Sequence, residues 1–236
     1  MPASKSILFT RSIDEPLVQK AAKKGLQIDS ITFITTEPST SSDVAEQVQA
    51  YAQQSIVAVF TSVHAVEAVI TQFPKKPDWK IFCIGGMTRE LVFSFFNESQ
   101  IIGTAKNASA LSEKIIGNHH VREVVFFCGD QRLDDLPNTL RASEIVVNEL
   151  IVYNTIQTPQ VIEKDYTGIA FFSPSAVHSF FSLNTIRTDV TLFSIGKTTT
   201  ATIQTYCANR IITSEWPGRE QMVELLIREL GEDEEA

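Results

Sequence analysis

One sequence pattern occurs twice in the chain. It consists of a short apolar strand, a residue with a side-chain hydroxyl, and the start of a helix. The segments "FTSVHAVEAV" (60–69) and "FFSPSAVHSF" (171–180) align without insertions at an offset of 111 positions. The same offset aligns "IFCIGGMT" (81–88) with "LFSIGKTT" (192–199). Because two separate strand–helix units keep a single offset, chance similarity explains them poorly. We therefore expect two related α/β domains, each presenting the same kind of loop.

Short β-branched runs alternate along the chain with segments whose apolar residues have helical spacing. Several runs are almost continuously hydrophobic, which is typical of parallel strands covered on both faces. A weaker repeat pairs 26–36 with 145–155 at an offset of 119 positions. Ten strands are too many for one compact sheet in 236 residues, so we expect two similar doubly wound parallel-sheet domains of the flavodoxin or Rossmann kind. The predicted strands are 6–10, 27–35, 55–60, 80–85, 100–103, 123–129, 144–153, 168–173, 191–196 and 210–214.

Two segments rich in turn residues, at about 35–42 and 154–160, are the candidate linkers. Five predicted strands lie between them, whereas the pieces outside hold two and three. A domain of ordinary size is completed only if 1–36 joins 157–236, with 37–156 inserted. The two crossings are then expected to form a hinge beside a cleft between the domains.

The composition narrows the function classes. The net charge is −8, which disfavours a general nucleic-acid or anionic-membrane surface. No apolar segment approaches the roughly 20 residues of a membrane span, and residues 1–12 lack the apolar core of a signal peptide. The three cysteines, Cys83, Cys128 and Cys207, are widely spaced, which suits the reducing cytoplasm.

Ligands of open parallel sheets bind beyond the carboxyl ends of the strands, so the residues at those ends are the candidate site. Backbone N–H groups at a helix start attract carboxylates or phosphates, and glycine lets a ligand approach them. Two such rims facing each other would bind a large polyanion without a basic protein. The candidates are Arg11, Thr61, Ser62, Gly85, Gly86, Gly129, Arg132, Ser173, Ser175, Gly196, Lys197, Thr198 and Thr199.

A purely structural interpretation stays open for several of these residues. Ser62, Ser173 and Ser175 could serve as helix N-caps. Gly85 and Gly196 could serve only the packing of strand against helix.

Other kinds of site receive no support. The chain contains no GxGxxG or GxxxxGK[ST] loop and no GxSxG nucleophile elbow. His119 and His120 are adjacent, which is not a helical metal-binding spacing, so no metal site is predicted. Tyr153 ends a long apolar run beside the second linker, where it is either a core or strand-edge residue or a hydroxyl that faces the cleft.

Taken in order over about 7–230, a set of motifs resembles the uroporphyrinogen-III synthase family. The motifs are "FTSVHAVEAV", "IGGMTRELV", "FFCGDQRLDDLPNTL", "ELIVYNT", "FFSPSAVHSF" and "IGKTTTATI". The resemblance implies two α/β domains joined by a two-stranded linker, with the linear tetrapyrrole hydroxymethylbilane bound between them. It implies a cyclising hydro-lyase of porphyrin and heme biosynthesis that needs no metal or organic cofactor. It also implies a cytoplasmic monomer, to which the preceding pathway enzyme can hand over the substrate.

In the implied reaction, the terminal hydroxyl of the bilane leaves as water and an electrophilic azafulvene remains. The substituted position of ring D attacks this carbon and gives a spiro intermediate, whose fragmentation and recombination invert ring D before closure to uroporphyrinogen III. Each pyrrole carries an acetate and a propionate, for which Arg11, Arg132 and Lys197 are candidate counter-charges. Since the free bilane closes without inversion, the catalysis is chiefly one of orientation.

The resemblance also implies residue roles. The family's tyrosine in a "VY.T" pattern maps onto Tyr153, which would assist departure of the hydroxyl. The threonines of an "IG.TT" loop map onto Thr198 and Thr199, which would contact substrate carboxylates. Lys197 stands where many members carry another residue, often proline, and Val63-His64 replaces a Pro-Arg or similar pair.

Two other function classes remain to be tested. One is a non-catalytic protein of the same two-domain shape that binds a tetrapyrrole or another anionic ligand. The other is a nucleotide-dependent enzyme of Rossmann type, against which the missing glycine-rich loops argue.

Overall fold

The computed structural model describes residues 5–216 and 218–231. The chain forms two compact units, here called unit 1 (Met1–Thr35 with Ile156–Ala236) and unit 2 (Thr36–Thr155). The first four residues of the N-terminal segment, in which no signal peptide is predicted, lie outside the described residues. That each unit folds as an independent domain stays a prediction.

Unit 1 contains a sheet of parallel strands, and their order in the sheet differs from their order along the chain. Its order is β11 (Ile211–Thr213), β10 (Thr191–Ser194), β9 (Gly168–Phe171), β1 (Lys5–Phe9) and β2 (Leu26–Ser30). Read from β2, this is the flavodoxin-like order, in which the first strand lies second from the edge. The order reverses between β1 and β9, which is the place where doubly wound sheets bind ligands.

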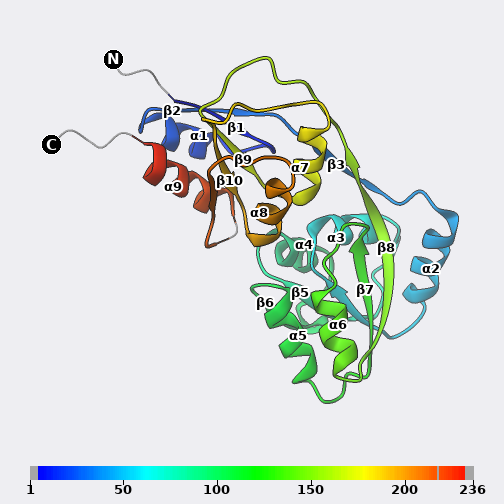
Figure 1. Ribbon diagram of the computed structural model, residues 1–236. Helices are drawn as coiled ribbons and strands as arrows, with labels where there is room; N and C mark the ends of the chain where they lie inside the picture. The colour runs from blue at the N-terminus through cyan, green and yellow to red at the C-terminus, as the bar shows by residue number, and fades with distance from the viewer. Residues whose placement is uncertain (1–4, 217, 232–236) are drawn as a thin grey trace. The chain divides into compact units, whose positions relative to one another are not determined.

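Helices cover both faces of this sheet. Alternate residues of β1 point to opposite sides, and both sets are buried. Ile7 and Phe9 belong to a cluster that includes residues of α1 (Glu15–Ala22) and α9 (Arg219–Leu230), which lie together in Figure 1. Leu8 belongs to a second cluster, shared with α7 (Pro174–Phe181) and α8 (Lys197–Gln204). Burial on both faces explains why the strands read as continuous apolar runs.

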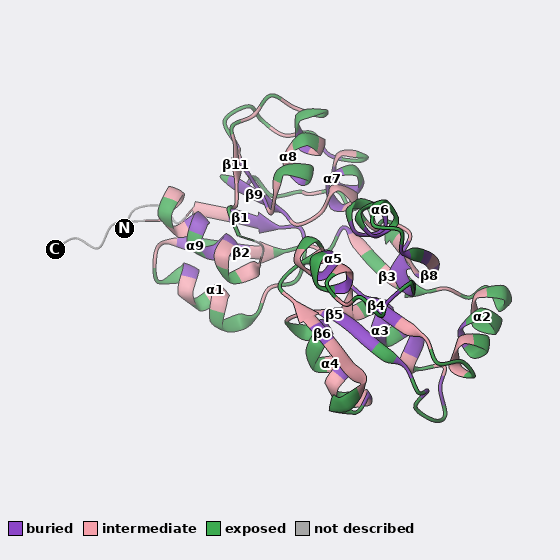
Figure 2. Cartoon of the chain, turned by 90° about the horizontal axis from the view of Figure 1, so that it is seen from below, coloured by how far each residue is buried: buried purple, intermediate pink, exposed green. Residues whose placement is uncertain are grey.

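The other sheet has the same plan with one more strand. Its strands β4 to β8 pair in parallel, and β3 is added beyond β8 at one edge. Figure 2 shows buried residues in β1, β4 and β5. The spatial order is β3 (Ile34–Pro38), β8 (Val146–Gln157), β7 (Glu123–Gly129), β4 (Val57–Phe60), β5 (Lys80–Ile84) and β6 (Ile101–Ala105).

Two helical layers cover this second sheet. Residues of α2 (Ser42–Ala52), α3 (Val63–Ile70) and α4 (Met87–Phe95) share one apolar cluster with one face of the strands. Residues of α5 (Ala108–Ile116) and α6 (Asp135–Ala142) share a cluster with the other face. A short 3-10 helix, Glu98–Gln100, precedes β6. The prediction of α/β architecture with parallel sheets is confirmed.

One predicted strand needs correction, whereas the two crossings between the units fall within the predicted ranges 35–42 and 154–160. The run 27–35 forms two strands, β2 and β3, which belong to different sheets. Both chain crossings between the units fall within strands rather than loops, in β3 and in β8, which continues to Gln157. Backbone pairing explains this, since Ser39 N–H donates to Val152 O at 2.8 Å and Thr158 N–H to Phe33 O at 2.9 Å. Pro38 is tolerated because it ends β3, which is an edge strand.

Candidate active site

The sequence repeat is also a structural repeat. In unit 1, β9 is the third of five parallel strands counted from β2, and in unit 2, β4 is the third counted from β8. A helix follows each strand, α7 after β9 and α3 after β4. Position by position, 81–88 and 192–199 share one sequence of buried, half-buried and exposed residues. The two units therefore present equivalent loops at the carboxyl ends of β4 and β5, and of β9 and β10.

The serines after β4 and β9 are helix N-caps. Ser62 Oγ accepts from His64 N–H at 3.2 Å, and Ser173 Oγ accepts from Ala176 N–H at 3.1 Å. Ser175 lies inside the first turn of α7 instead. Both caps leave the serine half-buried at the sheet edge, so that capping and contact with a ligand are compatible.

The glycines after β5 and β10 are not needed for strand–helix packing. A Cβ atom on Gly85 would meet only Ala105 O, at 3.7 Å, and one on Gly196 would meet no atom within 4 Å. Gly86 has a φ of 67°, which favours glycine, whereas Gly196 is extended and could be any residue. Space left open at Gly196 is what close approach of a ligand to the backbone requires.

The predicted ligands after Gly196 differ in accessibility. Lys197 and Thr198 are exposed, while Thr199 is only 2% exposed. Thr200 fixes the loop at Gly196. Its hydroxyl donates to Gly196 O at 3.3 Å and lies 2.7 Å from the hydroxyl of Thr213. Of the two threonines implied by the family pattern, Thr198 is the one that a ligand can reach.

Unit 1 gathers positive charge beside its repeated serine. The Arg11 guanidinium lies 5.5 Å from the centre of the Phe172 ring, next to Ser173. Although Arg11 as a residue is exposed, desolvation of its guanidinium and the charge of Arg219 lower its pKa, and Asp14 partly offsets this. Arg219 is in turn held by Asp14, with Nη1 to Oδ1 at 3.2 Å. Two mutually repelling guanidiniums at one edge are what an anionic ligand would stabilise.

Unit 2 places a tyrosine on its repeated serine. The Tyr153 hydroxyl, from β8, donates to Ser62 Oγ at 3.1 Å. Desolvation raises the pKa of Tyr153, against a smaller lowering by the Ser62 hydrogen bond. The His64 ring packs edge-on against Tyr153 with ring centres 5.8 Å apart, and His64 Nδ1 lies 3.0 Å from Glu67 Oε2. Tyr153 is half-buried and its side chain packs against the apolar core of unit 2, so that a hydroxyl facing a ligand stays a prediction.

Gly129 makes room for that tyrosine. A Cβ atom at Gly129 would lie 2.4 Å from Cζ and 2.7 Å from the hydroxyl oxygen of Tyr153. On the next residue, Asp130 Oδ1 accepts from Thr155 N–H at 2.8 Å, which ties the end of β7 to β8 just after Tyr153. The ring is therefore fixed in place by two neighbouring strands.

Arg132 pairs directly with a carboxylate, whereas Asp14 acts on Arg11 only through its charge. Its Nε donates to Glu149 Oε2, and its Nη2 lies 3.6 Å from Asp134 Oδ1. Arg141 Nη2 also donates to Glu149, at 2.7 Å. The Glu149 hydrogen bond is the main cause that raises the pKa of Arg132. Of the predicted counter-charges, Arg132 is thus expected to contribute least to the binding of an anionic ligand.

The structure brings the predicted residues into two groups. Arg11 lies beside the Ser173 loop in unit 1, and Ser62, Gly129 and Tyr153 lie together in unit 2. Sequence reasoning missed Arg219, although a basic residue in the first turn of a helix opposes the helix dipole and could have drawn notice.

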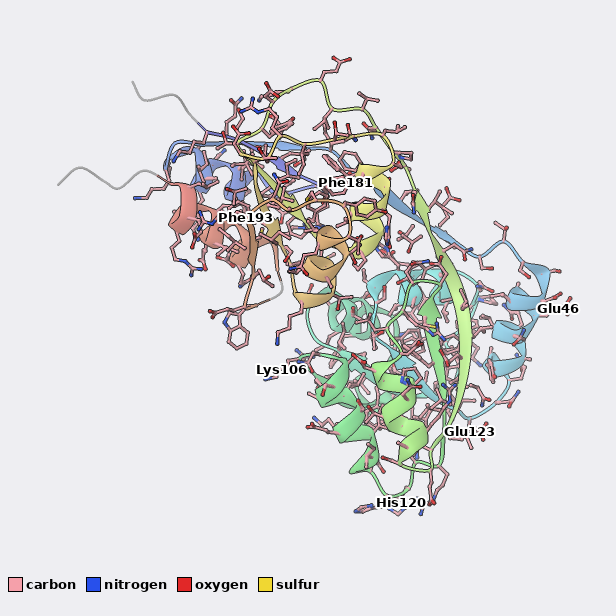
Figure 3. The ribbon with its side chains drawn as sticks, in the orientation of Figure 1. Glu46, Lys106, His120, Glu123, Phe181 and Phe193 are labelled. Carbon is pink, nitrogen blue, oxygen red and sulfur yellow. The ribbon has the colours of Figure 1, made fainter. Side chains whose placement is uncertain are left out.

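The paired histidines lie away from this site. His119 and His120 help line a surface hollow with Lys114 and Asn118, between α5 and the start of β7. Figure 3 shows Lys106 and His120 at opposite ends of α5. Within the described ranges, no three His, Cys, Asp or Glu side chains group as a metal site would need. None of the helices in that part of the chain is both long and apolar enough to span a membrane.

Comparison with known proteins agrees with this architecture. A family model described as uroporphyrinogen-III synthase HemD matches residues 15–224. No curated protein matches the chain. A crystal structure titled as a mutant uroporphyrinogen III synthase from the extremely thermophilic bacterium Thermus thermophilus is similar, with 13% identity and a TM-score of 0.62, covering 96% of this chain and 98% of that chain. A crystal structure of uroporphyrinogen-III synthetase from Helicobacter pylori has 14% identity and a TM-score of 0.64, covering 95% and 99%. At these identities the two structures establish the fold.

Proposed function

Because the chain belongs to the uroporphyrinogen-III synthase HemD family, we propose that it cyclises hydroxymethylbilane to uroporphyrinogen III with inversion of ring D and release of water. The observation that carries the proposal is the Tyr153 hydroxyl on Ser62 at the carboxyl end of β4, in a chain that the family model covers over 15–224. Such a hydroxyl would be a proton donor at the edge of the sheet where folds of this kind bind ligands.

The first step is loss of the terminal hydroxyl as water, for which the leaving oxygen needs a proton. Desolvation raises the pKa of Tyr153, so the phenol holds its proton at neutral pH. The azafulvene that remains is attacked by the substituted carbon of ring D. The resulting spiro intermediate fragments and recombines with ring D inverted, and closure regenerates the proton. No electrons are gained or lost overall, so the reaction needs no redox cofactor, and we propose that no metal takes part.

The carboxylates of the bilane provide most of the binding. Arg11, Arg219, Lys197 and Thr198, with the helix starts at Ser173 and Ser175, are proposed to bind them in unit 1. Thr61, Gly85 and Gly86 offer hydroxyl and backbone groups in unit 2. Arg132 contributes less, because Glu149 already pairs with it. Thr199 is proposed to support the loop rather than to touch substrate, because it is buried.

Orientation of the bilane is the larger part of the catalysis. The free bilane closes without inversion, so the enzyme must favour the spiro path by holding the chain with ring D turned. Carboxylate contacts distributed over the loops of both units restrain such a chain at many points. This explains how a protein with net charge −8 can bind a polyanion, since the donors are local.

We further propose a cytoplasmic monomer that receives its substrate from the preceding pathway enzyme. For the compartment, the support is that Cys83, Cys128 and Cys207 are free thiols.

The test supplies purified protein with hydroxymethylbilane, oxidises the products and separates the porphyrin isomers. The proposal predicts the type III isomer in large excess over the type I isomer. Type I alone, as in the absence of enzyme, contradicts it, and tight binding of a tetrapyrrole without type III product would identify a non-catalytic binding protein instead.

A further inference from the structure

The Ser62 hydroxyl is the acceptor of two hydrogen bonds. Tyr153 O–H reaches it at 3.1 Å and His64 N–H at 3.2 Å. A phenol is a far stronger acid than an aliphatic alcohol, so the phenol donates and the serine accepts. Both lone pairs of Ser62 Oγ are then engaged, and its own proton is the one that points toward a third group.

Tyr153 cannot easily turn to a different partner. Gly129 on β7 leaves its ring only the space that it fills, and the His64 ring packs against it. Its single proton is committed to Ser62. A bound substrate would therefore meet the Ser62 proton, with the phenol behind it, rather than the phenol proton.

We propose that Ser62 is a catalytic residue, the immediate proton donor to the leaving hydroxyl, and that Tyr153 restores its proton. This inference rests on the proposed function. As the C–O bond of the terminal hydroxymethyl group breaks, Ser62 O–H protonates the departing oxygen and water leaves. Tyr153 O–H transfers its proton to Ser62 Oγ, and the phenolate balances the charge of the azafulvenium cation.

The proton returns at the end of the cycle. When the macrocycle closes, the α carbon of ring D loses a proton as the pyrrole regains aromaticity. That proton passes to Ser62, and the Ser62 proton passes to Tyr153, which restores both hydroxyls. The net change is loss of one water from the bilane, as the proposed reaction requires.

The other unit shows that the cap alone does not create this pair. Ser173 caps α7 as Ser62 caps α3. The tyrosines of unit 1 bond elsewhere, since Tyr166 O–H donates to Asp29 at 3.1 Å and the Tyr206 hydroxyl lies 2.7 Å from His178 Nδ1. The relay is therefore specific to unit 2, and capping and proton donation can be separated by substitution.

The test compares variants at Ser62 in a single-turnover reaction with hydroxymethylbilane. Ser62→Asn keeps an N-cap but has no acidic hydroxyl, and it is expected to lower the rate constant about 100-fold. Ser62→Thr keeps both functions and should stay within about fivefold of the wild type. Asn107→Ala removes a comparable cap, to Ala110 N–H at 2.9 Å, from α5 of the same unit and should leave the rate unchanged.

A second readout needs no substrate. The phenol of Tyr153 is titrated by ultraviolet difference spectroscopy, each protein against its Tyr153→Phe version. Ser62→Ala is expected to raise the pKa of Tyr153 further, because the Ser62 hydrogen bond lowers it in the wild type. An unchanged titration would mean that the two hydroxyls are not bonded.

The outcomes separate the two proposals. Wild-type protein that forms type III isomer, with a Ser62→Asn variant at the wild-type rate, overturns the relay and leaves the function intact. Wild-type protein that forms only type I isomer overturns both.

Discussion

The five parallel strands of unit 1 and those of unit 2 have equivalent positions in their sheets, but the chain visits these positions in a different order in each unit. In unit 1, β1 and β2 come first and β9, β10 and β11 follow. In unit 2, β4, β5 and β6 come first, and β7 and β8 hold the places of β1 and β2. The repeated loops nevertheless stand at matched positions. What the repeat preserves is the position of a loop in the sheet, rather than its place along the chain.

The chemistry at those matched positions differs. Beside its capping serine, unit 1 has Arg11, on which the charge of Arg219 acts, whereas unit 2 has Tyr153. The arginine of unit 2 that corresponds to Arg11, Arg132, is neutralised by Glu149. We interpret unit 1 as the part that anchors carboxylates and unit 2 as the part that moves a proton.

Replacing the tyrosine would break the comparison most strongly. Tyr153→Phe is expected to slow turnover about 100-fold, because the variant lacks the proton behind Ser62. Far-ultraviolet circular dichroism should be unchanged. Tyr166→Phe is the matched control, since that phenol lies before β9 in unit 1 and donates to Asp29 at 3.1 Å. Wild-type turnover in Tyr153→Phe would remove the tyrosine from the mechanism.

Alanine substitutions at two glycines compare how tightly the two loops are packed. Gly129→Ala would drive a Cβ into the Tyr153 ring, with an expected loss of turnover of about tenfold or more and a destabilisation of about 1–3 kcal/mol. Gly196→Ala, at the loop of unit 1, meets no atom within 4 Å and should leave the free energy of unfolding unchanged. Urea denaturation measures both, and equal stabilities would show that Gly129 is not required for the ring.

The arginines test the division of charge between the units. Arg11→Gln and Arg219→Gln should each raise the KM for the bilane about tenfold, with kcat nearly unchanged. Arg132→Gln should raise it less than about threefold, since Glu149 already occupies its guanidinium. Steady-state kinetics at fixed ionic strength makes the comparison. A larger effect at Arg132 than at Arg11 would reverse the assignment.

The smallest expected effect is the pH dependence of the ion cluster in unit 2. Desolvation raises the pKa of Glu149, but hydrogen bonds from Arg132 and Arg141 outweigh it and bring the pKa below the ordinary 4.5. Its stabilising contribution is therefore present above pH 4.5 and is lost as the pH falls through the lowered pKa. The free-energy difference between wild type and Glu149→Gln should shrink on acidification through this range. A difference that stays constant would show that Glu149 is not held in its charged form.

Much of the fold can be predicted from the sequence, because buried parallel strands have apolar sequences and alternate with amphipathic helices. The boundary between β2 and β3 is not, since 27–35 is continuous in sequence while its two halves pair with different strands. Pairing partners distant in the chain, such as Val152 for Ser39, decide such boundaries.

The sequence marks the candidate site where the repeat lies, but it does not show which distant elements meet there. Ser62, Ser173 and the loop at Gly196 follow from the duplicated pattern, and Tyr153 from the family resemblance. That Tyr153 reaches Ser62 depends on the packing of β8 near the end of β4, and that Glu149 neutralises Arg132 depends on the pairing of β7 with β8. Neither contact is encoded by local spacing.

The proposed function predicts that a tetrapyrrole protects the repeated loops of unit 1 and also those of unit 2. Hydrogen–deuterium exchange with and without uroporphyrinogen III, under anaerobic conditions, tests it most directly. The account predicts slower exchange in the segments after β4 and β5 and in those after β9 and β10, with no change at 118–122 on the opposite edge of unit 2. Protection confined to one unit, or centred on 118–122, would contradict it.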